Sequence, residues 1–239
     1  MMITTMLFDL DGTLLPMNQD EFANAYVKGL ATAAMQADYE PKSFSKAVIA
    51  GTYAMVKNNG IGTNEEVFWN TIAEIYGEKI KKDMHIFDEF YRADFQKIRS
   101  VCGYEPKATE LIKRLRANGY RTVLATNPLF PRIATESRIR WAGLEPTDFE
   151  IYTTFEDAHY CKPNLNYYKE LLERLNLTPE ECLMIGNDVD DDMIVEKLGM
   201  KVFLLTDCLI NKSGADISVY PHGSYDALDS FINHIEDAE

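Results

Sequence analysis

Long apolar runs are absent from this chain of 239 residues, and none approaches the ~18 consecutive apolar residues that indicate a membrane-spanning helix. Cysteines are few and scattered. The four of them form no Cys-x-x-Cys pair, a pattern that favours neither a zinc site nor a disulfide framework and is typical of a reducing cytosol. The few residues before the first apolar run are too short for a signal peptide. We therefore expect a cytoplasmic protein without a membrane partner.

Positive charge is also in short supply, because 24 lysines and arginines face 38 aspartates and glutamates, for a net charge of −14. Such a chain repels polyanions, which argues against nucleic-acid partners. An anionic small substrate is repelled as well, unless the site itself supplies cations. A phosphate-handling pocket in this protein therefore needs a metal ion and at least one well-placed lysine or arginine.

The remaining composition is that of a globular protein, with 46% apolar and 26% charged residues. From about Gly103 onward, apolar runs alternate with amphipathic segments, which predicts a parallel sheet with helices on both faces. The predicted strands are 122–125, 149–154, 182–185 and 202–205. The predicted helices are 108–117, 131–143, 166–175, a segment ending at Gly199, and 225–234.

A long helical stretch separates the first apolar run from this alternating region. Apolar residues recur there at three- and four-residue spacing, which predicts four helices, with Thr63 or Asn64 as the N-cap of the third. These helices are 21–35, 42–57, 64–76 and 86–98. We expect a doubly wound α/β core with a parallel, Rossmann-like sheet, formed by residues 1–17 and 101–239. A small all-helical domain, residues 18–100, is inserted into it.

The most informative segment is the apolar run 6–8 and the polar residues that follow it: Asp9, Asp11, Gly12 and Thr13. The run predicts a strand buried on both faces of the sheet. Side chains alternate along extended backbone, so Asp9 and Asp11 are expected on one side. Two adjacent carboxylates repel each other, and burying them is costly unless a cation or a proton compensates. The pair predicts a metal-assisted nucleophile beside a general acid.

Polar residues also follow the later strands, and ligands of open parallel sheets bind beyond the carboxyl ends of the strands. Thr126 and Asn127 follow the second strand, just before a helix start whose free N–H groups can hold an anion. Lys162 precedes Pro163, which restricts the lysine to extended backbone and gives its side chain a defined direction. An ammonium there answers the need for positive charge beside the paired carboxylates.

The fourth strand is followed by an acidic segment, residues 186–192, that contains four aspartates in five positions. Such a patch needs a cation. It does not match a calcium loop, because Met193 and Gly199 stand where that loop has glycine and glutamate. A Mg²⁺ ion held by a few carboxylates, with its other positions open to water and phosphate oxygens, fits better.

In order and placement, these four strand-end motifs resemble those of the haloacid dehalogenase-like (HAD) hydrolase superfamily. The resemblance covers nearly the whole chain, and residues 18–100 look like the helical cap of that family. It implies a Rossmann-like core, Mg²⁺ as the cofactor and a small phosphorylated metabolite as the substrate. The residues that carry the resemblance are Asp9 and Asp11, Thr126, Lys162, and Gly186 with Asp188 and Asp192.

The resemblance also implies the role of each residue. Asp9 would be the nucleophile that takes the phosphoryl group, and Asp11 would protonate the leaving oxygen and then activate water. Thr126 and Asn127 would hold the transferring phosphoryl oxygens. Lys162 would neutralise the nucleophile and the charge that develops during transfer.

By the same resemblance, Mg²⁺ would be bound by Asp9, the main-chain carbonyl of Asp11 and an acid of the fourth motif. Many members of the family have aspartate directly after the fourth-motif glycine, whereas this chain has Asn187. We therefore expect Asp188 to be the direct ligand, with Asn187 and Asp192 holding metal-bound waters.

The leading hypothesis is a Mg²⁺-dependent phosphatase that hydrolyses a small phosphomonoester through an aspartyl-phosphate. A phosphomutase needs the same acids and stays open as an alternative. A dehalogenase is disfavoured by Asp11 and by the acidic fourth motif. A receiver-like phospho-aspartate module is disfavoured by the long helical insertion, and Asn187 leaves a non-catalytic binding protein open. The candidate substrate contacts in the helical region are Tyr53, Lys57, Trp69, Tyr91 and Arg92.

Overall fold

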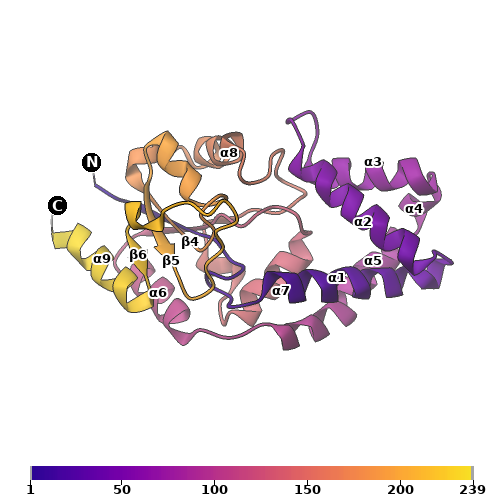
Figure 1. Ribbon diagram of the computed structural model, residues 1–239, viewed down its shortest axis with the longest axis horizontal. Helices are drawn as coiled ribbons and strands as arrows, with labels where there is room; N and C mark the ends of the chain where they lie inside the picture. The colour runs from indigo at the N-terminus through magenta and orange to yellow at the C-terminus, as the bar shows by residue number, and fades with distance from the viewer. Residues whose placement is uncertain (1, 238–239) are drawn as a thin grey trace.

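The computed structural model describes residues 2–237, and in this part of the chain six parallel strands form one sheet (Figure 1). The strand order is β3-β2-β1-β4-β5-β6. The strands are β1 (Thr5–Phe8), β2 (Arg121–Leu124), β3 (Ile151–Tyr152), β4 (Cys182–Gly186), β5 (Lys201–Leu205) and β6 (His222–Gly223). The prediction of an α/β fold with a parallel sheet is confirmed.

Strand β1 occupies the middle of the sheet. Phe8 pairs with Leu124 of β2 and with Ile185 of β4, so three neighbouring strands end at nearly one level. Met6 and Phe8 pack in one hydrophobic cluster and Leu7 packs in another, which confirms a strand buried on both faces. The residues just after these strands therefore emerge together at one edge of the sheet.

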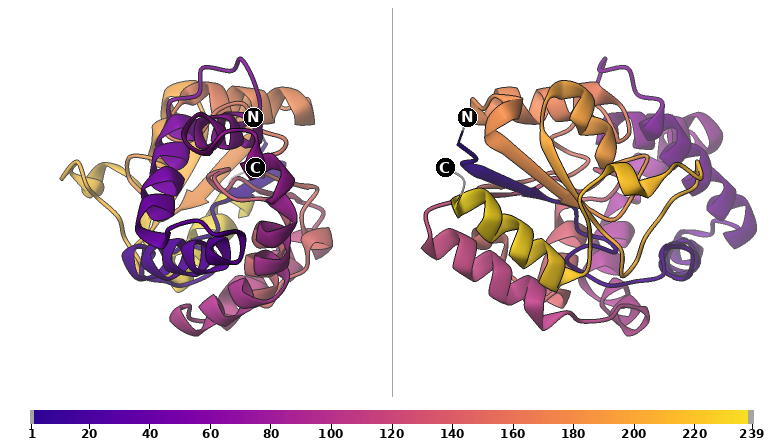
Figure 2. Two further views of the ribbon diagram at one scale, coloured as in Figure 1. Left: turned by 90° about the vertical axis from the view of Figure 1, so that its right-hand side faces the viewer. Right: turned by 60° about the vertical axis from the view of Figure 1, so that its left-hand side comes forward.

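Helices cover both faces of the sheet (Figure 2). Side chains of α6, α7 and α9 belong to the cluster around Phe8, and those of α8 and η5 belong to the cluster around Leu7. None of the helices in residues 2–237 is long and apolar enough to cross a membrane. The elements are α6 (Pro106–Ala117), α7 (Arg132–Trp141), α8 (Leu165–Leu175), α9 (Tyr225–Asp237) and the 3-10 helices η3 (Pro146–Asp148), η4 (Pro179–Glu181), η5 (Met193–Leu198) and η6 (Ile217–Val219).

Three details of the core differ from the sequence prediction. The segment before Gly199 is the 3-10 helix η5 and not an α-helix. The strand expected at 149–154 is paired only over Ile151–Tyr152. Strand β6 was not predicted, because two residues are too short to show an alternating pattern.

The residues between β1 and α6 form a group of helices beside the strand ends, in which α2 packs against α1 and α3 (Figure 1). The four predicted helices are confirmed, although the last is divided into α5 and η2, and the short α4 was not predicted. Thr63 caps α3 through a reciprocal capping box with Glu66, as expected. The elements are α1 (Gln19–Ala34), η1 (Met35–Ala37), α2 (Pro41–Val56), α3 (Asn64–Tyr76), α4 (Lys79–Lys82), α5 (Met84–Arg92) and η2 (Asp94–Val101).

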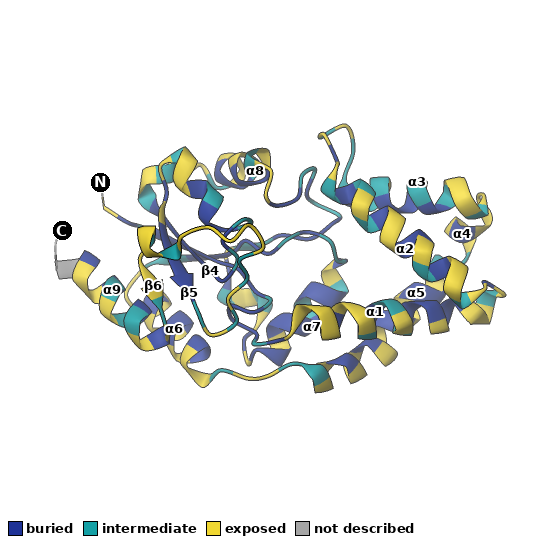
Figure 3. Cartoon of the chain, in the orientation of Figure 1, coloured by how far each residue is buried: buried dark blue, intermediate teal, exposed yellow. Residues whose placement is uncertain are grey.

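These helices bury aromatic side chains toward one another and leave their outer faces exposed (Figure 3). The rings of Phe44 and Phe87, for example, are stacked with centroids 5.3 Å apart. The first turn of α3 is also fastened to the core, because the N–H of Asn64 donates to the Ala158 carbonyl at 2.8 Å and its side-chain amide donates to the Pro128 carbonyl at 3.2 Å. The assignment of residues 18–100 as a separate domain stays a prediction.

The chain turns sharply directly after β1. Gly12 has a φ of +88°, a conformation that favours glycine. The Leu10 carbonyl accepts hydrogen bonds from the N–H groups of Thr13 (3.2 Å) and Leu15 (2.9 Å). A Cβ on Gly12 would collide with the side-chain amide of Asn187, whose oxygen accepts a hydrogen bond from the Thr13 hydroxyl at 3.0 Å. This turn therefore fixes the end of β1 against the residues that follow β4.

Gly12→Ala is expected to lower the free energy of unfolding by about 2–5 kcal/mol. The positive φ accounts for about 1–2 kcal/mol, and displacement of the Asn187 amide from its hydrogen bonds accounts for about 1–3 kcal/mol. Gly119→Ala is the matched control, because Gly119 has a φ of +87° and open space where its Cβ would lie. Urea unfolding of both variants measures the difference. Equal losses would contradict the importance of the contact with Asn187.

Candidate active site

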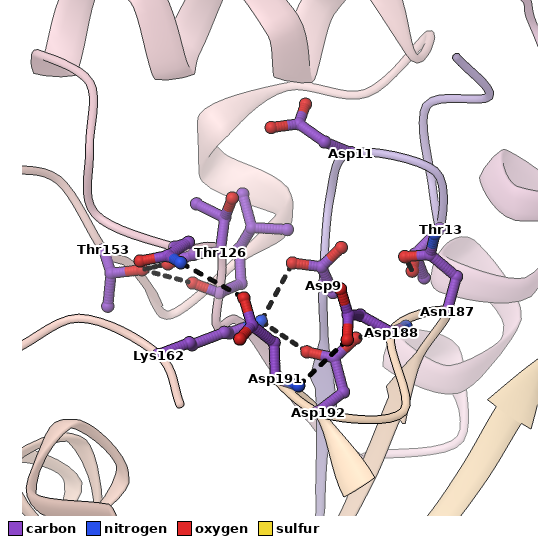
Figure 4. Close-up of polar contacts among 12 residues, drawn as sticks. Asp9, Asp11, Thr13, Thr126, Thr153, Lys162, Asn187, Asp188, Asp191 and Asp192 are labelled. Atoms are coloured by element: carbon purple, nitrogen blue, oxygen red, sulfur yellow. Dashed lines mark hydrogen bonds and ion pairs between the residues drawn. The ribbon is translucent and has the colours of Figure 1, made fainter. Parts of the chain in front are cut away.

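Polar side chains from three strand ends and one loop meet in a cavity of about 470 Å³ (Figure 4). Asp9 directly follows β1, Thr126 comes shortly after β2, and Asp188 comes shortly after β4. Lys162 comes from the loop before α8. Helices α1 and α2 provide the opposite wall. The fold therefore brings together one residue from each of the four motifs of the sequence.

Lys162 is buried, and its ammonium lies between two carboxylates (Figure 4). The Nζ atom is 2.9 Å from Oδ1 of Asp9 and 2.6 Å from Oδ1 of Asp192. Burial alone would lower the pKa of Lys162, but the charges of Asp192 and Asp9 outweigh it and raise the pKa well above its usual value. Lys162 is therefore a fixed cation at the base of the cavity.

Asp192 is as deeply buried as Lys162. Its second oxygen accepts a hydrogen bond from the N–H of Asp188 at 3.1 Å, so the carboxylate also supports the loop after β4. Burial raises the pKa of the Asp192 carboxyl, and the positive charge of Lys162 opposes this shift. Gly186 lies so close that a Cβ there would collide with this carboxylate. The direct contact of Asp192 with Lys162 was not expected, and its role around a metal-bound water stays a prediction.

The side chain of Asp188 stabilises the loop that follows β4. Its Oδ1 accepts hydrogen bonds from the N–H groups of Asp190 (2.8 Å) and Asp191 (3.0 Å). The N–H of Val189 donates to the carbonyl of Ile210 at 2.9 Å, which ties this loop to the segment after β5. Asp188 still lines the cavity, on the same side as Asp9 (Figure 4). One oxygen therefore holds the loop while the residue faces the site.

Asn187 is buried, and protein groups use both ends of its amide. Its oxygen accepts from the Thr13 hydroxyl at 3.0 Å, and its Nδ2 donates to the Cys208 carbonyl at 2.6 Å. An aspartate at this position would place a carboxylate oxygen against that carbonyl and lose the donor. This gives a physical reason for the asparagine that follows the fourth-motif glycine. The expectation that it holds a metal-bound water stays a prediction.

Thr126 and Asn127 lie at the rim between β2 and α7 and line the cavity. The Thr126 carbonyl accepts hydrogen bonds from the hydroxyls of Thr153 (2.6 Å) and Tyr167 (2.9 Å), which fix the backbone here. The Nδ2 of Asn127 donates a hydrogen bond to Oδ2 of Asp191 at 3.3 Å. Its buried oxygen has no hydrogen-bond partner among residues 2–237. Both side chains are thus placed beside the Asp9–Lys162 pair.

Asp11 lines the same cavity but pairs with a different cation. Its Oδ2 accepts a hydrogen bond from the guanidinium of Arg138, a fully buried residue of α7 that lies 4.2 Å over the ring of Phe130. Strand alternation does not extend to the two acids, because β1 ends at Phe8, and the Asp11 carboxylate lies apart from that of Asp9 (Figure 4). Sequence analysis did not identify Arg138, since an arginine inside an amphipathic helix is ordinarily exposed.

The environment of Asp11 also differs from that of Asp9 in its electrostatics. Burial raises the pKa of the Asp11 carboxyl to about 6, while the Arg138 guanidinium opposes the shift and the charge of Asp9 adds to it. Asp11 also keeps one buried oxygen without a hydrogen-bond partner in the described part of the chain. The carboxyl is therefore poised to exchange a proton near neutral pH.

The donor atoms of the cavity suit a hard divalent cation. Five aspartates line it, and Lys162 is the one lysine or arginine among the described lining residues. In residues 2–237 no three acidic, histidine or cysteine side chains are already grouped to hold a metal ion. The predicted set of two carboxylates and the main-chain carbonyl of Asp11 does not need such a group. Because Mg²⁺ prefers oxygen ligands, the excess of carboxylate oxygen fits it.

Four of the five candidate substrate contacts of the helical region line one of two different cavities. Tyr53 lines the main cavity. Trp69, Tyr91 and Arg92 line a second cavity of about 300 Å³ near α5 and α7. Lys57 lines neither of them, and its ammonium lies 5.6 Å from the centroid of the Tyr53 ring.

Arg138→Met is expected to lower the free energy of unfolding by about 3–5 kcal/mol, because it leaves the Asp11 carboxylate without its counter-ion. Methionine keeps an unbranched apolar side chain at this position but removes the guanidinium, which also packs on Phe130. Arg140→Met, a half-exposed arginine of the same helix, should cost less than about 1 kcal/mol. Urea unfolding compares the two, and Asp11→Asn in the Arg138→Met background should recover part of the loss. Equal losses in the two arginine variants would show that the buried Asp11–Arg138 pair contributes no more to stability than the exposed ion pairs of Arg140.

The comparisons with known proteins agree with this geometry. A curated relative, pyrophosphatase PpaX of Bacillus cereus (strain G9842), is 25% identical over 201 residues, which are 84% of this chain and 82% of that protein. The crystal structures of a predicted phosphoglycolate phosphatase from Haemophilus somnus 129PT and of a HAD phosphatase from Thermococcus onnurineus each have a TM-score of 0.60 at 16% identity. Each match covers 96% of this chain and 98% of that chain. Bacillus subtilis YfnB, crystallised with magnesium, has a TM-score of 0.55 at 19% identity, covering 98% of this chain and all of YfnB.

The solved structures confirm the α/β fold of the chain. The sequence pattern of the haloacid dehalogenase-like hydrolases matches residues 3–195. This span includes every residue that lines the cavity of Asp9 and Lys162. The chain therefore belongs to the haloacid dehalogenase-like hydrolases.

Proposed function

We propose that this hydrolase is a Mg²⁺-dependent phosphatase that cleaves a small phosphomonoester through a phosphoryl group held on Asp9. The observation that carries the proposal is the buried ion pair of Asp9 and Lys162 at the base of the cavity. A carboxylate nucleophile of this kind divides one difficult displacement into two easier ones. The name of the relative PpaX, a pyrophosphatase, supports the transfer of a phosphoryl group to water.

Lys162 has two functions in the proposed reaction. It pairs with the Asp9 carboxylate and fixes one of its oxygens, because the same ammonium is also held by Asp192. It also places positive charge where negative charge develops on the transferring group. Fixed charges in a largely buried site need no reorganisation during the reaction, which is why they lower the barrier.

Asp11 is the proposed general acid and base. As the carboxylate of Asp9 attacks phosphorus, the bond to the leaving oxygen breaks and Asp11 gives that oxygen its proton. The ionised Asp11 then takes a proton from the water that attacks the phosphoryl group, so Asp9 is released. A pKa raised to about 6 suits a group that must both give and take a proton near neutral pH.

The remaining residues would position the phosphoryl group. The Thr126 hydroxyl and the Asn127 amide line the cavity and would donate hydrogen bonds to its oxygens. The carboxylates of Asp9 and Asp188 and the main-chain carbonyl of Asp11 would hold Mg²⁺. When bound, the ion would offset the excess of carboxylates and stabilise the phosphoryl oxygens.

We further propose that residues 18–100 act as a cap over the phosphoryl site. Helices α1 and α2 form the wall of the cavity opposite the strand ends. A wall in this place covers the leaving group and limits the access of water to the phosphoryl group.

The first test is steady release of phosphate from p-nitrophenyl phosphate in the presence of Mg²⁺. Continuous turnover, lost with EDTA and restored with added Mg²⁺, supports a phosphatase. Phosphorylation that stops after one turnover supports a receiver-like switch, and transfer to a sugar phosphate in place of water supports a phosphomutase.

Asp9→Asn is expected to abolish turnover, because an amide cannot form the acyl phosphate. Asp11→Asn should slow turnover by about 10²–10⁴-fold, the usual contribution of general acid–base catalysis. Asp190→Asn is the control, since Asp190 lies in the fourth motif but its Oδ2 accepts a hydrogen bond from Ser213 outside the cavity. Initial rates with saturating Mg²⁺ measure all three. Full activity of Asp9→Asn would refute the mechanism.

Loss of a residue that supports a metal ligand from outside usually lowers metal affinity by about 10–100-fold. Asp188→Asn changes a proposed direct ligand, so we expect it to weaken Mg²⁺ binding by more than this. Asparagine retains the Oδ1 acceptor that holds the loop, so the variant removes mainly the charge. Asp192→Asn should change Mg²⁺ affinity less, because Asp192 is paired with Lys162. Calorimetric titration with Mg²⁺ compares them. The reverse order of effects would make Asp192, and not Asp188, the direct ligand.

A further inference from the structure

The main cavity has two chemically different ends. Asp9, Lys162 and Asp188 form the charged end, where the proposed phosphatase would hold the phosphoryl group. The other end lies between α1 and α2 of the helical region and the turn after β2. Its side chains are mainly apolar, and they include Phe22, Val27, Ile49, Tyr53, Val56 and Leu129. A phosphomonoester bound at the charged end would point its leaving group toward this apolar wall.

The α2 part of this wall is exposed although it is apolar. Ile49 and Tyr53 are 60% and 64% exposed, and together with Val56 they follow the spacing of one helix face. Other apolar residues of α2, such as Val48 and Met55, are buried inside the helical region. The face at Ile49 and Tyr53 therefore does not serve the packing of the helices. It is open toward the cavity.

The described residues that line the apolar end include no lysine or arginine. Among the described lining residues, Lys162 is the one lysine or arginine, and it is already bound to Asp9 and Asp192. Lys57 stacks on the ring of Tyr53 but does not line the cavity. A second anionic group of the substrate, bound at the apolar end, would therefore lose its hydration against apolar side chains and meet no unused cation among the described lining residues.

We propose that the substrate of this site is a phosphomonoester whose leaving group is uncharged and largely apolar, such as an aromatic or alkyl alcohol, bound against Ile49 and Tyr53. This inference rests on the proposed phosphatase function and specifies its substrate class. The volume of about 470 Å³ lies in the range of small-molecule sites and leaves room for a ring beside the phosphoryl group. Substrates with a second phosphate or a carboxylate on the leaving group are disfavoured.

The test compares two esters that differ in one group, 4-methylphenyl phosphate and 4-carboxyphenyl phosphate. The carboxylate makes its phenol a slightly better leaving group, so the chemistry alone favours the ester that we expect to be poorer. The kcat/KM for the methyl ester should exceed that for the carboxyl ester by about tenfold or more, from the lost burial of an apolar group and the repulsion by the aspartates. Pyrophosphate should be a poor substrate for the same reason.

Ile49→Lys places a cation on the exposed face of α2 and should largely abolish this preference, raising kcat/KM for the carboxyl ester relative to the methyl ester by about tenfold. Ile75→Lys is the matched control, because Ile75 is an isoleucine of α3 that is 52% exposed and lies outside the cavity. It should leave the preference unchanged. Both positions are exposed, so neither lysine needs to be buried for the variant to fold.

Two results would overturn the inference in different ways. If wild type hydrolyses both esters with equal efficiency, or prefers the carboxyl ester or pyrophosphate, the phosphatase stands and the apolar leaving group is wrong. If it releases no phosphate from either ester or from p-nitrophenyl phosphate, the proposed function fails and this inference fails with it. An equal response of Ile49→Lys and Ile75→Lys would also contradict the placement of the leaving group at α2.

Discussion

The Lys162 ammonium lies out of water between the carboxylates of Asp9 and Asp192, and the arrangement of the strand ends around it depends on this pairing. An unpaired charge in this position would be strongly destabilising, whereas two close carboxylates compensate its lost hydration. The three residues come from the ends of β1 and β4 and from the loop before α8, so one electrostatic contact joins three segments. Because these segments form the base of the cavity, the same contact fixes the carboxylate of Asp9, the proposed nucleophile.

The second acid of the first motif is separated from this contact by its own cation. Asp11 pairs with the buried Arg138, while Asp9 pairs with Lys162, so two carboxylates only two residues apart have different environments. Different environments are the usual way in which proteins give two carboxyl groups different roles. Asn187 contributes from a third side, since its amide bridges Thr13 and the carbonyl of Cys208 and keeps the turn after β1 against the loop after β4.

The sequence predicted most of this architecture, because the relevant signals are local. Alternating apolar runs and amphipathic segments are sufficient for a parallel sheet, and its topology then brings the strand-end motifs to one edge. Arg138 could not be found in this way, since its burial depends on Asp11 and Phe130, which are far from it along the chain. The same holds for the contact of Asp192 with Lys162. Short elements such as α4 and β6 were not predicted, because four and two residues are too few to show a repeating pattern.

The low content of lysine and arginine in the chain is also seen in the lining of the main cavity. A chain with a net charge of −14 can attract a phosphoryl group only where a cation offsets the negative charge. Among the described lining residues of the cavity, that cation is Lys162 at its base. Mg²⁺ would complete that end of the site, but neither cation extends to the wall of α2, where Ile49 and Tyr53 are exposed. In the proposed reaction, electrostatic attraction would therefore act on the phosphoryl group alone, and the rest of the substrate would be recognised by shape and by burial of apolar surface.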